Sequence, residues 1–188
     1  MSTSTQFDAA QALQLMQDRR SMGLSKLSDQ PVDRALIERM LEAANWAPSH
    51  GDTEPWRFAV FMGEGRQALA DIFTRVDENA HKRAFAAPVW IAIGLEPAVN
   101  DEGELKMTME EELMAVACAV QNLHLMARAQ GLAGMWHSKG ISVHPGVAEQ
   151  LGWTPPSRIM GFFMCGWPNC DWPAGERGPW QDKVRFFD

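Results

Sequence analysis

The sequence predicts a single domain of the α+β class. Its 188 residues and 21.0 kDa suit one compact domain. Hydrophobic residues make up 46% and charged residues 22%, which is typical of a globular chain rather than a disordered one. Helical patterns dominate, and the three or four strand patterns between them do not alternate regularly with helices. That order favours α+β over a doubly wound sheet.

Charge and hydropathy exclude several classes of function. The formal net charge of -7 argues against non-specific binding to nucleic acid or to anionic membranes, which both require basic surface. The apolar run at residues 113–120 is far shorter than the ~20 residues that span a bilayer, and the N-terminus does not read as a secretory signal. Cys118, Cys165 and Cys170 lack CxxC spacing, so we expect a reducing cytoplasm, with Cys118 in the core.

The first part of the chain predicts two helices followed by a long loop. Residues 8–19 have apolar positions at helical spacing. A second helix is expected to open at Pro31, because proline is tolerated at the first helical position, and to run to about Trp46. Pro48 ends it. Residues 47–55 are polar and rich in helix breakers, as binding loops often are.

The middle of the chain predicts strands around a further helix. Residues 56–62 indicate a strand, and residues 63–65 a turn into a helix that ends near Val76. Residues 88–95 form an apolar run that indicates a buried strand. Residues 100–106 are acidic and loop-like.

The longest helix is expected at residues 110–130, with three glutamates in its first turn and Gly131 as its cap. Its segment 113–120 is apolar on all sides, which predicts burial on more than one face. Residues 134–144 are interpreted as a second binding loop. The remaining expected elements are a helix at 145–151, a strand at 158–167 and a possible edge strand at 184–187.

Three familiar kinds of site are not indicated. Residues 63–68 match GxGxxA, but no acidic residue ends a second strand about 20 residues later, so an ordinary turn is favoured over a dinucleotide site. The histidines lack HExxH spacing and no GxSxG elbow occurs. We therefore expect no metal site and assign no catalytic residue.

Arg19, Arg20 and Ser21 form a candidate phosphate-binding segment where the first helix meets a loop. Arginine offers bidentate, permanently charged donors to a phosphate. Basic residues are also favoured at a helix C-terminus by the helix dipole, so this segment alone leaves both interpretations open.

Three further motifs occur in order along the chain. They are Trp46-Ala-Pro-Ser-His50 with Glu54-Pro-Trp56-Arg57-Phe58, then Gly134-Met-Trp136-His137-Ser138, then Gly166-Trp-Pro168. Together with Arg-Arg-Ser, this set resembles the nitroreductase family, and most closely its small bacterial members. The resemblance extends from about residue 14 to residue 168.

The resemblance implies a mostly antiparallel central sheet flanked by helices in an intertwined homodimer, with FMN bound at the interface. It places Arg19, Arg20 and Ser21 at the phosphate and ribityl chain. Trp46 and His50 would reach the flavin from the other subunit. The border of the flavin would be formed by Trp136, His137 and Ser138.

The resemblance also implies an oxidoreductase that uses NADH or NADPH to reduce nitroaromatic, quinone or related acceptors in two half-reactions, a ping-pong mechanism. The cofactor carries the difficult step, so no side chain needs to act as a nucleophile. The alternatives are a flavin enzyme of the same fold with other chemistry, such as a dehydrogenase or dehalogenase, and a flavin-binding protein with little turnover.

Three positions depart from the family pattern. Gly23 stands where many members carry a basic residue near the flavin pyrimidine, which leaves Lys26, His137 or a backbone dipole as substitutes. Glu54 replaces the usual Gln before Pro-Trp, and His137 stands where close relatives often have Arg.

The Trp-rich tail, residues 167–187, has too little regular structure to be a domain. Leaving its aromatic side chains in water is costly, so we expect the tail to wrap over the partner subunit and to bury Trp172, Trp180 and Phe186 there.

Overall fold

The computed structural model describes residues 7–187. Its sheet has four strands in the order β1-β2-β4-β3, and each neighbouring pair is antiparallel. The α+β class expected from the sequence is confirmed. The strands, in chain order, are β1 (Trp56–Met62), β2 (Val89–Leu95), β3 (Ala133–His137) and β4 (Arg158–Gly166).

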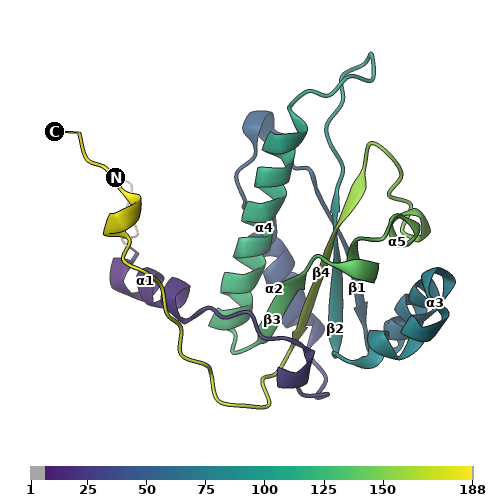
Figure 1. The fold of residues 1–188 in the computed structure, drawn as a ribbon, viewed down its shortest axis with the longest axis horizontal. Coiled ribbons are helices and arrows are strands. Elements are labelled where there is room, and N and C mark those ends of the chain that lie inside the picture. Colours follow the sequence, from purple (N-terminus) through teal and green to yellow (C-terminus); the bar gives the residue numbers. More distant parts are fainter. Residues whose placement is uncertain (1–6, 188) are drawn as a thin grey trace.

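Helices cover both faces of the sheet (Figure 1). On one face α2 (Arg34–Asn45) and α4 (Met109–Ala129) bury Met40, Val116 and Leu123 against the sheet. On the other face α3 (Arg66–Val76) and α5 (Pro145–Gln150) pack on Trp90 and Phe162. Covering both faces explains why all seven residues of β2 are buried. The remaining helix is α1 (Ala9–Asp18), and short 3-10 segments lie at Leu24–Lys26, His50–Asp52, Gly63–Gly65, Glu78–Phe85, Gly140–Val143 and Gln181–Lys183.

Local chemistry sets the ends of α4. Thr108 and Glu111 form a reciprocal capping box, and acidic side chains occupy the first turn. At the other end Gly131 takes φ 79°, the left-handed conformation of a helix stop. The helix therefore has sharp limits, close to the expected residues 110–130.

Two expected elements were placed wrongly. The second helix does not open at Pro31: it begins at Arg34, because the Asp33 side chain accepts a hydrogen bond from the Ala35 amide. The segment interpreted as a binding loop at 134–144 begins instead as β3, which pairs with β4 from Ala133 to His137.

Residues 184–187, considered as an edge strand, are part of no strand. They follow the 3-10 turn at Gln181–Lys183, and Phe186 and Phe187 are exposed. A strand needs a neighbour to accept its hydrogen bonds, and this segment lies away from the sheet (Figure 1).

The middle of α4 is buried on one side only, contrary to expectation. Val116 and Val120 pack against the sheet, whereas Leu113 and Met114 are exposed, Met114 by 58%. Cys118 also lies on the exposed side, so its expected core position is wrong. An apolar helix face is thus left without a cover in the single chain.

The two terminal segments extend from the body together. The C-terminal tail (residues 167–187) begins at the body, where residues 167–169 are bonded to residues 26–28, and Figure 1 shows its later part beside α1, away from the sheet. The chain has an accessible surface of 11684 Å², whereas a compact monomer of this mass is expected to expose about 9,000 Å². Phe7, Leu13 and Trp180 are among the exposed apolar residues of these segments.

The GxGxxA segment is an ordinary turn. It begins as the 3-10 segment Gly63–Gly65 between β1 and α3, and the strand that follows α3 runs antiparallel to β1. A dinucleotide turn requires a parallel crossover instead. A Cβ added at Gly63 or Gly65 would meet nothing within 4 Å, so no close approach depends on either glycine.

No helix within residues 7–187 combines the length and apolar character needed to cross a lipid bilayer.

We predict that Gly134→Ala destabilises the fold and that Gly65→Ala does not. A Cβ at Gly134 would lie 2.5 Å from the Phe163 ring and 2.7 Å from the Met164 carbonyl oxygen. Overpacking of this kind costs about 1–3 kcal/mol. Gly65 has helical φ and ψ and open space around it, so alanine there is neutral or stabilising. Urea unfolding of both variants measures the difference, and equal stabilities would contradict the close packing at Gly134.

Candidate functional site

The segment after α1 pairs with the edge strand β3. Ser21 and Gly134 form a parallel bridge, and the Met22 amide donates to the Gly134 carbonyl at 2.9 Å. Further along, the Ser28 amide donates to the Trp167 carbonyl at 2.8 Å. Two of the motifs found in the sequence, 113 positions apart at Ser21 and Gly134, are therefore neighbours in space.

Arg19 is half-buried and has no acidic partner. Its Nη1 donates to the Ser21 hydroxyl at 3.3 Å, and within residues 7–187 no carboxylate lies within ion-pair distance of it. Burial lowers the pKa of Arg19, and the positive charges of Arg177 and Arg20 lower it further. An uncompensated guanidinium of this kind is the chemistry of an anion site.

The sequence motifs did not single out Arg177, but its positive charge acts on Arg19 from 158 positions along the chain and lowers the pKa of Arg19. Within the described residues it also lacks a carboxylate at ion-pair distance. The sequence did not indicate a role for Arg177, because this residue lies in a tail with little regular structure.

Arg20 has a different environment from Arg19. Its guanidinium donates to the carbonyl oxygens of Gln17, Arg19 and Pro173. The backbone at Arg19 is extended, with φ -60° and ψ 128°. The two guanidiniums therefore have different partners, a side-chain hydroxyl for Arg19 and main-chain carbonyls for Arg20.

The side chains at the end of β3 are held by hydrogen bonds. The Trp136 Nε1 donates to the Met160 carbonyl at 2.9 Å, and its ring packs on the core on the α4 side of the sheet. His137 Nδ1 is 2.9 Å from the hydroxyl of Ser142, which is fully buried. Ser138 is exposed. Trp136 and His137 therefore present fixed surfaces beside the Ser21 segment.

His137 is a hydrogen-bonding group rather than a cation. Burial lowers its pKa, and the positive charges of Arg83 and Lys139 lower it further. His137 was one of the groups expected to replace the basic residue that many family members carry at the position of Gly23. With a lowered pKa, it is poorly suited to carry a positive charge near neutral pH. Gly23 itself packs near the Met135 side chain, where an added Cβ would lie 3.7 Å from it.

The loop that carries Trp46 and His50 is held by the N-terminus of α4. His50 Nδ1 lies 2.8 Å from Glu111 Oε1. The buried Glu112 accepts a hydrogen bond from the Thr53 hydroxyl at 2.7 Å. Trp46 is 82% exposed, so its large ring is free to contact another molecule.

Two residues of this loop have left-handed backbone conformations. Asp52 has φ 52° and Glu54 has φ 44°. Such conformations are strained for residues other than glycine and cluster at functional sites. The Glu54 amide is held by the Ser49 hydroxyl at 3.2 Å, and its side chain points away from the core into solvent.

The predicted site residues fall into two groups at opposite ends of α4. His50 contacts Glu111 in the first turn of this helix, whereas Asp18, next to Arg19, pairs with Arg128 in its last turn. Seventeen residues of helix correspond to about 25 Å. Arg19, Ser21 and β3 lie together, but His50 of the same chain lies far from them.

We predict that stability falls below pH 6.5 because of His124. This residue of α4 lies edge-on to the Phe163 ring, with centroids 4.6 Å apart. Burial, with a smaller effect of Arg19, lowers its pKa to about 4 from 6.5. The unfolded chain takes up the proton below about pH 6.5 but the folded chain only near pH 4. Stability is therefore lost as pH falls through this window, by on the order of 3 kcal/mol in total.

Urea unfolding at pH 7 and pH 5 tests this prediction. His124→Gln should flatten the difference between the two pH values, whereas the exposed His81→Gln should leave it as in the parent. An unchanged pH dependence in His124→Gln would show that other groups dominate.

Comparisons with known proteins identify the family of the chain. The model of the "Nitroreductase family" matches residues 16–167. "Putative NAD(P)H nitroreductase YdjA" of Escherichia coli K12 is 30% identical over 163 residues, covering 84% of this chain and 88% of the relative. A 5,6-dimethylbenzimidazole synthase of Rhodospirillum rubrum is 30% identical over 174 residues, covering 81% and 82%.

The fold has solved counterparts. A nitroreductase-like family protein from Bacillus cereus superposes with a TM-score of 0.78 at 26% identity, and all of both chains is covered. The family model spans Ser21, Trp46, His50 and Trp136, and ends at Trp167, within one residue of the limit expected from the motifs. The chain belongs to the nitroreductase family of oxidoreductases.

Proposed function

We propose that this chain is a single-domain, FMN-dependent oxidoreductase that uses NADH or NADPH to reduce nitroaromatic, quinone or related acceptors. The observation that carries the proposal is the Arg19 guanidinium, which has no carboxylate partner among the described residues and lies at Ser21 beside the edge strand β3; the positive charge of Arg177 is close enough to lower its pKa. The chain as a whole is acidic, so a local excess of positive charge needs an anionic ligand to explain it.

The donor set fits a flavin mononucleotide. A phosphate monoester carries close to two negative charges, which two arginines and a hydroxyl satisfy. Arg19 would hold the phosphate, with the Ser21 hydroxyl beside it for the phosphate or the ribityl chain. Arg177 adds the second charge. A dinucleotide flavin would need an adenine site, and the GxGxxA turn does not supply one.

The flat part of the cofactor fits the end of β3. Trp136 and His137 are held in place by Met160 and Ser142, which gives a planar ligand a rigid border. When bound, FMN supplies the two-electron chemistry that the side chains lack. The chain's own residues bind and orient it, and His137 stays neutral as a hydrogen-bonding group.

We further propose a homodimer in which each flavin site takes residues from both chains. Trp46 and His50 lie too far from Arg19 to complete the same site within one chain, as the length of α4 requires. The exposed face of α4 at Leu113 and Met114, and the projecting terminal segments, provide surface for a second copy. The reducing cytoplasm is the compartment we propose, from the three free cysteines.

A second candidate is a flavin enzyme of the same family with other chemistry. The relative named as a 5,6-dimethylbenzimidazole synthase is as similar in sequence, at 30% identity, as the one named as a nitroreductase. Family membership therefore leaves the acceptor open. Anaerobic reduction of the purified protein by NADH or NADPH, followed by addition of a nitroaromatic or a quinone, separates the candidates. Bleaching of the flavin without reoxidation by either acceptor would favour the second.

Mass analysis of the ligand released by heat tests the cofactor directly. FMN is expected, and the release of FAD, or the failure of the apoprotein to take up FMN, would overturn the proposal.

We predict that Arg19→Ala weakens FMN binding by about one to two orders of magnitude. Loss of a charge-assisted hydrogen bond to a phosphate costs on the order of 1.5–3 kcal/mol. Arg34→Ala is the matched control, because Arg34 is exposed and pairs only with Glu38 one turn along its helix. Flavin titration of the apoproteins measures both dissociation constants. Equal affinity in the two variants would place the phosphate elsewhere.

We predict that Met114→Glu dissociates the dimer and releases flavin with it. The substitution places a charge on the exposed apolar face of α4, where an isologous contact would bury two copies of it. Val60→Glu is the control, because it places the same charge on another exposed apolar side chain, on the edge strand β1. Light scattering of the eluted protein across a dilution series gives the mass. A flavin-loaded species near 21 kDa would contradict the composite site.

A further inference from the structure

The Arg20 guanidinium is engaged by main-chain carbonyl groups of two segments distant in sequence. Its Nη1 donates to the Gln17 carbonyl at 2.5 Å and to the Arg19 carbonyl at 2.8 Å. Its Nε donates to the Pro173 carbonyl at 3.0 Å. The Gln17 carbonyl belongs to the last turn of α1, where carbonyls lack helical partners. Arg20 therefore caps α1 and holds the C-terminal tail at the same time.

Gly175 brings the tail into direct contact with the same guanidinium. A Cβ at Gly175 would overlap Arg20 Nη2 and Cζ. The third nitrogen of Arg20 thus faces the tail backbone. Two of the three guanidinium nitrogens, Nε and Nη1, therefore donate to main-chain carbonyls, and Nη2 lies against the tail at Gly175.

A second contact holds the tail to the same place. The Trp172 indole donates to the Asp18 carbonyl at 2.5 Å. The Arg128 guanidinium lies 4.3 Å from the centroid of the Trp172 ring and pairs with the Asp18 carboxylate at 3.5 Å. The ends of α1 and α4 are therefore joined to the tail by a cluster that also neutralises Arg128.

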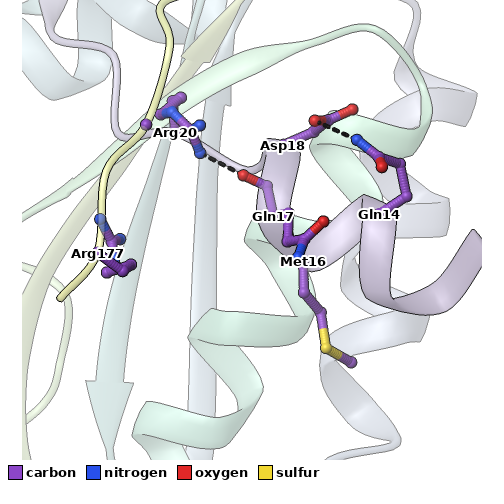
Figure 2. A pocket seen from close by; sticks show the side chains of 7 residues that line it. Gln14, Met16, Gln17, Asp18, Arg20 and Arg177 are labelled. Atoms are coloured by element: carbon purple, nitrogen blue, oxygen red, sulfur yellow. Dashed lines mark hydrogen bonds between the residues drawn. The ribbon is translucent and has the colours of Figure 1, made fainter. Parts of the chain in front are cut away.

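These contacts fix the tail immediately before Arg177. Arg20 and Arg177 line one cavity of about 540 Å³, together with Gly175 and residues of α1. Figure 2 shows Arg20 turned toward Gln17, and Arg177 on the adjacent stretch of tail. Only Glu176 separates Gly175 from Arg177, so anchoring the backbone at Gly175 restricts the positions that the Arg177 side chain can reach.

We infer that Arg20 is a positioning residue: with Trp172 and Gly175 it latches the tail to the end of α1, so that Arg177 joins Arg19 in binding the ligand's phosphate. The inference rests on the proposed function, because it takes the phosphate to be that of FMN. The two adjacent arginines then have different roles: Arg19 binds the phosphate, and Arg20 binds main-chain carbonyls and holds the tail.

A double-mutant cycle with two flavins tests the latch. Dissociation constants for FMN and for riboflavin, which lacks the phosphate, are measured for apoproteins carrying Arg20→Ala, Arg177→Ala and both. We expect each single variant to lose about tenfold in FMN affinity and to keep its riboflavin affinity. The double variant should lose no more than Arg177→Ala alone, because Arg20 acts through Arg177. A general loss of structure would instead weaken both flavins.

Gly175→Ala tests the latch from the tail side. Its methyl group displaces the end of a flexible arginine side chain, so the fold should survive while FMN affinity falls as in Arg20→Ala. Gly178→Ala is the matched control three residues along, where an added Cβ would lie 3.7 Å from Lys183 Nζ and should change nothing.

The outcomes separate the latch from the function it serves. Multiplicative losses in the double variant would mean that Arg20 contacts the phosphate itself, and the latch would be overturned. Unchanged FMN affinity in Arg20→Ala and Gly175→Ala, with a loss in Arg19→Ala, would also overturn the latch but leave the flavin site standing. Failure of the parent apoprotein to bind FMN would overturn both proposals.

Discussion

The backbone contact between the Ser21 segment and β3 determines where the candidate site can be. The Met22 amide reaches the Gly134 carbonyl, and the Phe163 ring and the Met164 carbonyl fill the space that a side chain at position 134 would need. Glycine is therefore required by close packing at this point rather than by φ. The contact sets the distance from Arg19 and Ser21 to Trp136 and His137, so a substitution at Gly134 should disturb the fold and the site together.

The length of α4 imposes the second constraint. Its first turn holds the His50 loop through Glu111 and Glu112, and its last turn holds the end of α1 through Arg128. A rigid helix cannot bring those ends together. A two-fold arrangement resolves the separation, because the His50 loop of one copy can then approach the Arg19 segment of the other. The same arrangement would cover the exposed apolar side of α4, which the single chain leaves in water.

Much of the fold could be predicted from local pattern. The strand at 56–62 has the expected limits, and the longest helix differs by one residue at each end, because capping and apolar spacing are local properties. The strand at β3 was missed because Gly134 and the polar residues after it suggest a loop, and only pairing with β4 makes five residues a strand. Cys118 was misplaced for a related reason: an apolar helix does not indicate which of its faces the chain itself covers.

The motifs of the candidate site predicted the family, but they did not predict that Arg19 and Arg20 have different environments. The order of Arg-Arg-Ser, the His50 loop and the Trp136 motif pointed to one family, and the family is confirmed. The path of the tail decides which of the two arginines donates to main-chain carbonyls. That path could not be predicted, because the tail has little regular structure and so no local sequence pattern. Arg177 was missed for the same reason. The net charge of -7 means that this chain attracts an anionic ligand only where cationic side chains have no acidic partner. Arg19 and Arg177 have no carboxylate at ion-pair distance among the described residues. Arg128, in contrast, is neutralised by Asp18.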